Sequence, residues 1–354
     1  MKTRSILLAV GVAALAAPYA VAWDYEGHRL VNQVALAALP PEFPDFVRIP
    51  ENAERIAFLA GEPDRWRNSP DYPLKQLNEL DHYLDIEDLP DAGLDLTQVP
   101  PLRLNFAVQY AAARQANLAK FPPVDPAKNL AGTAEWPGFA PWAIAENFGK
   151  LRSAFSYLRA YQERGRPEEV ANAQANILYI MGVMGHYVGD CAQPLHTTKH
   201  HHGWVGENPG GYTTWKGIHS WVDGGFIGVA KVSLETLRPR IGPAGAISLA
   251  PRADGRDPLF ATVIAYLIEQ NRKVEPLYAL EKAGLLGNDN RPIRQEGRDF
   301  IEGQLVTGGQ MLASIWLTAW RTSFPDTFLL NHLANRAARE KGLIGPPPQM
   351  PANK

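Results

Sequence analysis

Residues 186–196 read HYVGDCAQPLH, and the spacing within this stretch predicts both a helix and a site. His186 and Asp190 are four residues apart, which stacks two side chains on one face of a helix. Pro194 prevents the helix from continuing unbroken, so His196 follows on a new course of the chain. Three ligand-type side chains this close together indicate part of a metal site. The alternative is a helix end that carries a hydrogen-bonded core histidine and a surface aspartate.

The segment that leads into this stretch, 167–189, has apolar residues at helical spacing and a proline at its start, as many helices do. The same spacing recurs on both sides of it, at residues 30–36, 51–60, 102–121, 142–161, 230–240, 258–283, 297–324 and 325–341. No segment keeps the period-two alternation of a strand beyond a few residues. We therefore expect an all-α protein, a single mostly helical domain with long loops around the site.

Glycine, proline and acidic residues mark the segments that we expect to be irregular. The Gly-Glu-Pro sequence at 61–63 is expected to end the helix at 51–60. Segments 122–141 and 197–217 are expected to be loops. The acidic segment 81–96 has no recognisable series of calcium ligands, so we expect a solvated loop there.

The N-terminus has the pattern of a secretory signal. Two basic residues precede an apolar run at 6–17 that is too short for a membrane span, and Ala-Val-Ala at 20–22 is a typical cleavage site. We expect a signal peptide over residues 1–22, cleavage between Ala22 and Trp23, and export to the periplasm or the medium. We also expect a monomer without a transmembrane anchor, with one domain at 23–344 and a disordered tail at 345–354.

Charge and cysteine content limit the functions that fit this chain. The formal net charge is −2, and it becomes −4 when Lys2 and Arg4 leave with the signal peptide. This balance argues against a broadly basic surface that coats nucleic acid, although bound metal ions can supply local positive charge. Cys191 is the only cysteine, so an internal disulfide is excluded, and we expect it to be a packing residue.

Residues of ligand type outside the opening stretch extend the candidate site. Trp23 would be the first residue of the mature chain, so its α-amine and carbonyl oxygen can chelate a cation together. Nitrogen and carboxylate ligands without cysteine suit a hydrolytic zinc site, and bridging aspartates suit a centre with several ions. The alternatives are a buried aromatic anchor for Trp23 and a surface residue for His28. The candidate ligands are Trp23, His28, Asp64, His82, His186, Asp190, His196, His219 and Asp223.

The order of these residues resembles that of the zinc-dependent single-strand nucleases, which share a superfamily with bacterial zinc phospholipases C. The resemblance spans residues 23–223. It consists of the N-terminal Trp, a His five residues later, His-Tyr after an upstream Asp, His-x-x-x-Asp-x-x-Gln-Pro-Leu-His, and a later His-x-x-x-Asp. The spacing from Trp23 to His28 and the final Asp223 favour the nucleases, whereas the ending 313–324 is closer to the phospholipases.

The resemblance implies three zinc ions per chain. One would be held by Asp64, His82, His186 and Asp190, a second and more exposed one by His196, His219 and Asp223, and a third by Trp23, His28 and the bridging Asp190. It also implies that Asp64 and Arg67 are catalytic, that Arg67 binds the scissile phosphate, and that Tyr83 stacks on a base. Six positive charges against three ligand carboxylates would attract a phosphate.

The expected function is therefore that of a secreted zinc-dependent phosphodiesterase. The resemblance implies an endonuclease that hydrolyses single-stranded DNA or RNA through zinc-activated water, with 3′-nucleotidase activity as an addition. The alternative is a zinc-dependent phospholipase C acting on phospholipid head groups. A weaker alternative is a secreted zinc-binding protein without catalysis. Three consecutive histidines, His200, His201 and His202, cannot easily face one ion, so we expect them at the rim of the site or at the surface.

Overall fold

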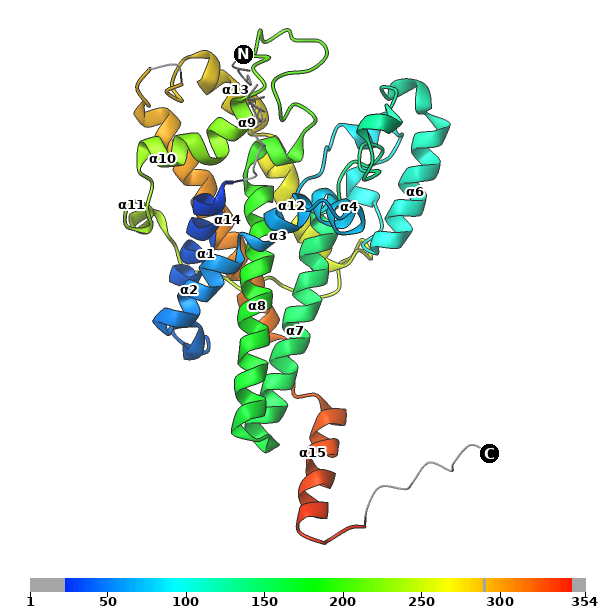
Figure 1. Ribbon diagram of the computed structural model, residues 1–354, viewed down its shortest axis with the longest axis vertical. Helices are drawn as coiled ribbons and strands as arrows, with labels where there is room; N and C mark the ends of the chain where they lie inside the picture. The colour runs from blue at the N-terminus through cyan, green and yellow to red at the C-terminus, as the bar shows by residue number, and fades with distance from the viewer. Residues whose placement is uncertain (1–22, 289–290, 346–354) are drawn as a thin grey trace, which may run out of the picture.

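Two long helices, α7 (Ala140–Arg164) and α8 (Pro167–Ala192), lie side by side at the centre of the molecule (Figure 1). Only two residues connect them, so they run antiparallel. Proline at the first position of α8 costs no hydrogen bond, because the first N–H groups of a helix have no partner within it. The carboxylate of Glu169 accepts a hydrogen bond from the Arg166 amide (2.8 Å) and pairs with Arg336 of α15 (Thr327–Glu340), which closes this end of the helix pair.

The computed structural model describes residues 23–288 and 291–345, and the all-α prediction is confirmed there, because these residues contain no strand. The predicted signal peptide and most of the predicted tail lie outside the described residues. The other α-helices are α1 (Tyr25–Ala38), α2 (Pro50–Leu59), α3 (Glu62–Arg67), α4 (Tyr72–Leu80), α5 (Asp88–Asp91), α6 (Arg103–Ala116), α9 (Ile218–Ser220), α10 (Phe226–Ala230), α11 (Leu234–Leu237), α12 (Pro258–Asn271), α13 (Val274–Lys282) and α14 (Gln295–Arg321). Short 3-10 helices lie at η1 (Asp45–Arg48), η2 (Leu96–Gln98), η3 (Leu118–Lys120), η4 (Pro126–Lys128), η5 (Pro194–Thr197) and η7 (Arg238–Arg240), and a π-helical turn at η6 (Trp221–Gly225).

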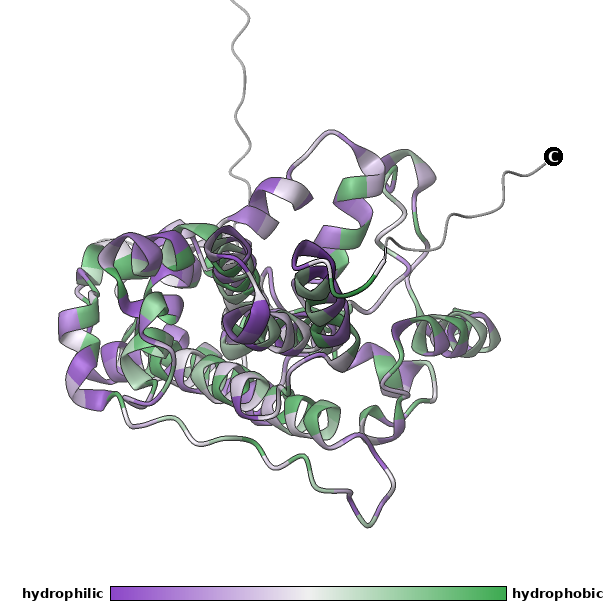
Figure 2. Cartoon of the chain, turned by 90° about the horizontal axis from the view of Figure 1, so that it is seen from below, coloured by the Kyte–Doolittle hydropathy of each residue, from purple (hydrophilic) through white to green (hydrophobic). Residues whose placement is uncertain are grey.

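Helices α1, α2 and α14 pack on α8, while α12 and α15 pack on α7. The helices show both hydrophobic and hydrophilic residues, as expected of a bundle (Figure 2). The contact between α1 and α8 is close because Gly185 has no side chain: a Cβ atom there would lie 1.6 Å from the Asn32 side-chain oxygen. The Asn32 amide donates to the carbonyls of Ile56 (2.8 Å) and Gly182 (3.1 Å), which ties α1 to α2 and α8. This polar contact lies one helical turn from His28 and His186.

Two sequence predictions of chain breaks differ from the structure. Residues 61–63 end α2 as expected, but a new helix, α3, begins at Glu62, and Pro63 lies in its first turn, where its missing N–H costs nothing. The single helix predicted at 258–283 is divided into α12 and α13. Lys273 lies at the bend, where its ammonium group donates to the side chain of Gln304 (2.8 Å). The loop prediction for 197–217 is confirmed.

Cys191 is fully buried in α8, as predicted for a packing residue. Within residues 23–288 and 291–345, no helix combines the length and hydropathy that crossing a membrane requires. The segment 313–324, which resembles the phospholipases, begins in α14 and ends three residues beyond it, and its residues Ile315, Trp316 and Leu317 are completely buried. The apolar character of its helical part therefore reflects the core, whereas Phe324 is 75 % exposed.

Candidate metal centre

The structure brings eight of the nine predicted ligands together at the C-terminal end of α8. Helix α8 itself supplies His186 and Asp190, and the 3-10 helix that follows it supplies His196. The others come from segments that pack against this end: His28 from α1, Asp64 from α3, His82 from the turn after α4, His219 from α9 and Asp223 from η6. They form three groups, each with ligand atoms within 4.8 Å of one another.

The N-terminal group consists of His28, His186 and Asp190, all completely buried. One carboxylate oxygen of Asp190 lies 3.3 Å from Nε2 of His28, and the other lies 3.2 Å from Nε2 of His186. The two imidazole rings stack with 3.8 Å between their centroids. Asp190 therefore directs its two oxygens at two different histidines, which is the arrangement of a bridging carboxylate. His28 is a core residue, and the alternative that placed it at the surface is wrong.

The central group consists of Asp64, His82 and His186, so it shares His186 with the N-terminal group. Oδ1 of Asp64 lies 3.6 Å from Nε2 of His82. The same oxygen pairs with Nε of Arg67 at 2.8 Å, because the two residues are three apart on α3. Arg67 thus holds the Asp64 carboxylate and lines the cleft next to the group.

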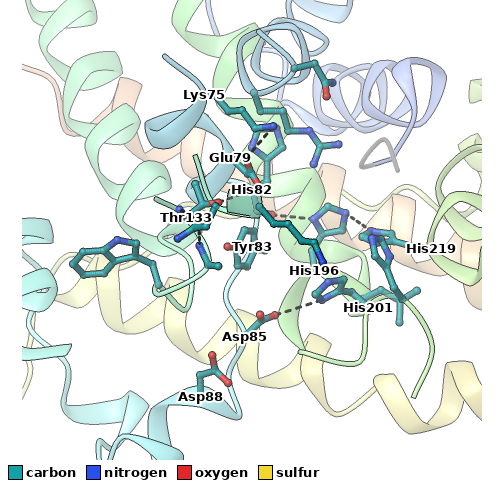
Figure 3. Close-up of a pocket in the computed structure, with 18 residues that line it drawn as sticks. Lys75, Glu79, His82, Tyr83, Asp85, Asp88, Thr133, His196, His201 and His219 are labelled. Carbon is teal, nitrogen blue, oxygen red and sulfur yellow. Dashed lines mark hydrogen bonds and ion pairs between the residues drawn. The ribbon is translucent and has the colours of Figure 1, made fainter. Parts of the chain in front are cut away.

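The C-terminal group consists of His196, His219 and Asp223 (Figure 3 shows the two histidines). Nε2 of His219 lies 2.9 Å from Nε2 of His196 and 3.1 Å from Oδ2 of Asp223. The π-helical turn that carries Asp223 continues with Gly224, where a Cβ atom would lie 2.1 Å from the Asp24 carboxylate. Glycine at this position lets the turn approach the start of α1, and π-turns of this kind are frequent at functional sites.

Three of the histidines are oriented by backbone carbonyls. Nδ1 of His186 lies 2.7 Å from the Ala60 carbonyl, Nδ1 of His196 lies 3.0 Å from the His82 carbonyl, and Nδ1 of His82 faces the Asn78 carbonyl. A carbonyl accepts only from N–H, so each Nδ1 carries a proton and each Nε2 is the atom that faces the group, where the neutral imidazole offers its lone pair. This is the usual way in which proteins orient metal-binding imidazoles.

The protonation of the groups suits cation binding. Burial, followed by the charge of Arg67, lowers the pKa of His82 to about 3, and burial also lowers the pKa of His196. Both imidazoles are therefore neutral, as metal ligands must be. Burial raises the pKa of Asp190, but the nearby histidines led by His186 outweigh this and hold it well below its usual range. Burial raises the pKa of Asp223 well above its usual range, and a bound cation would relieve the cost of its ionisation.

Buried atoms without hydrogen bonds show that these residues fit metal ions. Among the described residues, neither carboxylate oxygen of Asp190 has a hydrogen-bond partner, nor do the Nε2 atoms of His28, His82 and His186. Two ligand atoms at about 2.0–2.1 Å from a tetrahedral zinc ion lie about 3.3–3.4 Å apart. The observed distances of 3.2 and 3.3 Å around Asp190 are close to this value. The three groups can therefore hold metal ions.

Comparison with protein-family models, curated proteins and solved structures finds no match. The nuclease resemblance thus stays a prediction drawn from the motifs. The convergence of eight residues from seven segments is a separate observation, since nothing in the spacing of the motifs requires His28, His82 and His186 to meet.

Trp23 lies where the prediction needs it, and its role as a ligand stays a prediction. Its side chain is completely buried, and its indole N–H donates to the Gly189 carbonyl at 2.8 Å. Gly189 directly precedes Asp190, so this bond holds the start of the described chain beside the N-terminal group. The alternative of a buried aromatic anchor is confirmed, and it is compatible with a ligand role for the backbone of the same residue.

A cleft of about 550 Å³ opens next to the central and C-terminal groups. Its lining includes His82, His196 and His219, so the cleft borders two of the three groups. Positive side chains and aromatic rings also line it, namely Arg67, Lys75, Lys128, Tyr83 and Trp136. Tyr83 therefore faces the cleft, as expected of a residue that contacts substrate.

Some cleft residues were not predicted from the sequence. Asp85 was expected in a solvated loop, but only 14 % of its side chain is exposed, and its Oδ1 lies 3.8 Å from Nδ1 of His201 (Figure 3). His201 and His202 line the cleft, which agrees with a place at the rim. The same prediction is wrong for His200, which is buried and stacks on Trp204 at 4.0 Å between centroids. Asp85 is only three residues after the predicted ligand His82 in the sequence. This short separation could have predicted that Asp85 also lies at the cleft.

Proposed function

We propose that this protein is an exported, zinc-dependent phosphodiesterase that cleaves single-stranded nucleic acid, with three zinc ions per chain. The observation that carries the proposal is the position of Asp190, whose two oxygens face His28 and His186 at 3.3 and 3.2 Å. A buried carboxylate shared in this way suits a centre of adjacent ions, and such centres serve phosphoester hydrolysis. The motif order, which resembles the nucleases, supports the choice of substrate.

Side chains of the cleft would bind and orient the substrate. The guanidinium of Arg67 is held by Asp64 at 2.8 Å and lines the cleft, so it can bind oxygens of the scissile phosphate and stabilise charge that develops there. Tyr83 and Trp136 offer rings on which unpaired bases can stack, and stacking requires a single strand. Lys75 and Lys128 can contact neighbouring phosphates.

Zinc would supply a Lewis acid and would lower the pKa of a bound water so that it is a nucleophile near neutral pH. His82, His186 and His196 would hold their lone pairs in place through the backbone carbonyls that their Nδ1 atoms contact. Asp64 and Arg67 would connect the central group to the substrate phosphate. No nucleophilic side chain is needed, which agrees with the burial of Cys191.

One observation favours phospholipids as an alternative substrate. Leu77 of α4 and Leu130 of the adjoining loop are 61 % and 63 % exposed, and Gln76 joins their segments by donating to the Ala131 carbonyl at 2.8 Å. Both segments also line the cleft, through Lys75 and Lys128. Exposed leucines on segments that border a phosphodiesterase cleft can contact lipid tails.

The proposal includes cleavage of the exported chain between Ala22 and Trp23, and a monomeric product. The support for cleavage is that Trp23 is completely buried beside Asp190, with its indole bonded to Gly189. A free amine at this residue would complete the N-terminal group, which otherwise has three protein ligands.

The test is to express the full chain with its leader, purify the mature form and measure zinc per chain by elemental analysis. The same sample is assayed on single-stranded DNA, RNA, a 3′-nucleotide and a phosphatidylcholine emulsion. We expect close to three zinc ions and cleavage of nucleic acid. Lipid cleavage alone would replace the nuclease by the phospholipase, and three ions without any cleavage would favour a non-catalytic zinc-binding protein.

The variant Arg67→Gln separates catalysis from metal binding. Arg67 belongs to none of the three groups, but its pair with Asp64 orients a predicted ligand, so the variant is assayed with zinc in excess. Under that condition we expect it to hold its zinc while cleavage falls by about 100-fold or more, as for loss of a charge-stabilising donor. Arg65→Gln on the same helix is the matched control, because Arg65 pairs with Glu62 and is outside the lining of the cleft. Equal activity of both variants would contradict the role given to Arg67.

A further inference from the structure

Gln193 lies between the helix that carries Asp190 and the 3-10 helix that carries His196, and its side chain is completely buried. Its side-chain oxygen accepts a hydrogen bond from the Leu195 amide at 2.6 Å and thereby caps the 3-10 helix. Its side-chain nitrogen donates to Oδ1 of Asp223 at 2.7 Å. One amide thus connects the segment of His196 to a predicted ligand thirty residues later in the chain.

The length of the Gln193 side chain indicates that this residue does more than cap the 3-10 helix. Helix N-caps favour Asp, Asn, Ser and Thr, whose short side chains reach the nearby N–H groups. Gln is not among the favoured caps, so capping alone does not account for it. The extra methylene group lets the nitrogen of the same amide reach Asp223 while the oxygen caps. The bond to Asp223 therefore explains why this position carries Gln.

The bond also distinguishes the two oxygens of Asp223. Oδ1 is occupied by the amide, whereas Oδ2 lies 3.1 Å from Nε2 of His219 and has no hydrogen bond within the described part of the chain. Asp223 can then bind an ion through Oδ2 alone, on the side where His196 and His219 present their nitrogens. An amide is neutral, so it orients the carboxylate without adding a charge to the group.

We propose that Gln193 is the positioning residue of the C-terminal group and sets its affinity for metal by holding Asp223 in place. The proposal rests on the metal centre described above, and it goes beyond it because Gln193 is not a ligand. Hydrogen-bonding partners of metal ligands typically change metal affinity by about 10- to 100-fold when they are lost. The expected effect is confined to one ion of the three, because among the described residues the side-chain hydrogen bonds of Gln193 go to Asp223 and to the Leu195 amide, and to no ligand of the other two groups.

Two substitutions of Gln193 share only the loss of the bond to Asp223. Gln193→Asn keeps a good N-cap but is one methylene too short to reach Asp223. Gln193→Met keeps the length and the packing volume but removes both hydrogen bonds. Each variant is loaded with zinc, and the affinity of the weakest ion is measured by competition with a chelator. Both are expected to bind that ion about 10- to 100-fold more weakly while they retain the other two.

Gln304 provides the matched control. It is 3 % exposed, its amide nitrogen donates to the Ala192 carbonyl (2.6 Å) and to Gln270 (2.8 Å), and its amide oxygen accepts from Lys273 (2.8 Å). It is therefore a buried glutamine whose hydrogen bonds within the described residues go to none of the predicted ligands. Gln304→Asn and Gln304→Met are expected to lower thermal stability without changing the affinity of any ion. Thermal unfolding of the metal-free proteins shows whether all four variants fold.

Cobalt substitution gives a readout that a merely structural role would not change. The visible spectrum of Co²⁺ reports coordination geometry, so Gln193→Asn is expected to alter the bands of one ion and Gln304→Asn none. Unchanged affinity and spectrum in both Gln193 variants would overturn the positioning role while leaving the metal centre intact. Equal weakening by the Gln304 variants would also overturn it. A wild-type chain that binds no ion at His196, His219 and Asp223 would overturn the centre itself.

Discussion

Nε2 of His196 lies 2.9 Å from Nε2 of His219. The Nδ1 proton of His196 is held by the His82 carbonyl, so its Nε2 carries a lone pair directed at the second ring. Burial and the neighbouring histidines, led by His196, keep the pKa of His219 well below its usual range, so this imidazole is also neutral. Two neutral imidazoles grouped with a buried carboxylate, Asp223, could hold a divalent cation.

Asp190→Asn tests the shared carboxylate. The amide is nearly isosteric, but it has no negative charge and cannot bridge two ions, so we expect the metal content to fall from three to about one ion per chain, with loss of activity. Elemental analysis of the purified variant checks this. Asp85→Asn is the control, because Asp85 is an aspartate of the same cleft that belongs to none of the three groups. Near-normal zinc in Asp190→Asn would count against the trinuclear assignment.

An N-terminal extension tests the role of Trp23. A mature chain with one alanine before Trp23 lacks the free α-amine at that residue but keeps the indole bond to Gly189. We expect it to bind one ion fewer than the chain that begins at Trp23, and to unfold at a similar temperature when both are metal-free. Elemental analysis and thermal unfolding provide the two measurements. A full complement of three ions in the extended chain would refute a ligand role for the amine.

Gly185→Ala tests the contact that brings α1 to α8. The added Cβ would lie 1.6 Å from the Asn32 side-chain oxygen, so we expect the free energy of unfolding to fall by about 1–3 kcal/mol or more, as for an overpacked core. Gly149→Ala in α7 is the matched control, because its Cβ would meet no atom within 4 Å. Alanine is the better helix former, so the control is expected to gain about 0.5–1 kcal/mol. Denaturant unfolding measures both, and a neutral Gly185→Ala would show that the helices do not pack as described.

The pH dependence of stability follows from the buried histidines. Burial, followed by the charge of His202, lowers the pKa of His201 from 6.5 to about 4, and burial lowers that of His28 to about 4. Between pH 6.5 and about 4, His28 and His201 bind protons in the unfolded chain but not in the folded chain. The contribution of these two histidines to the free energy of unfolding is therefore expected to fall as the pH falls from about 6.5 to about 4.

The variant His201→Gln isolates one of these protons. We expect its metal-free form to lose less stability than the wild type over the same pH range, by the equivalent of one histidine. His332→Gln, at an exposed position of α15, serves as the control and is expected to follow the wild-type curve. Urea unfolding at a series of pH values gives the comparison, and parallel curves for His201→Gln and the wild type would contradict the assignment.

The sequence by itself determined the helices and the local ligand pairs. Helical spacing predicted α7, α8 and α14 because each buries one apolar face, and that periodicity is local. The pairs His186–Asp190 and His219–Asp223 lie at 3.2 and 3.1 Å because a helical turn brings together residues four apart. Proline misled the prediction at 61–63, since it ends one helix and equally suits the first turn of the next.

Only the tertiary structure decided which of these pairs meet and which polar residues are buried. The approach of His28 to His186 depends on the absence of a side chain at Gly185 and on the hydrogen bonds of Asn32, neither of which has a periodic signature. The bond of Gln193 to Asp223 likewise joins residues on separate segments. Periodicity reports the environment of each residue along one element, whereas these contacts arise from the packing of different elements around the end of α8.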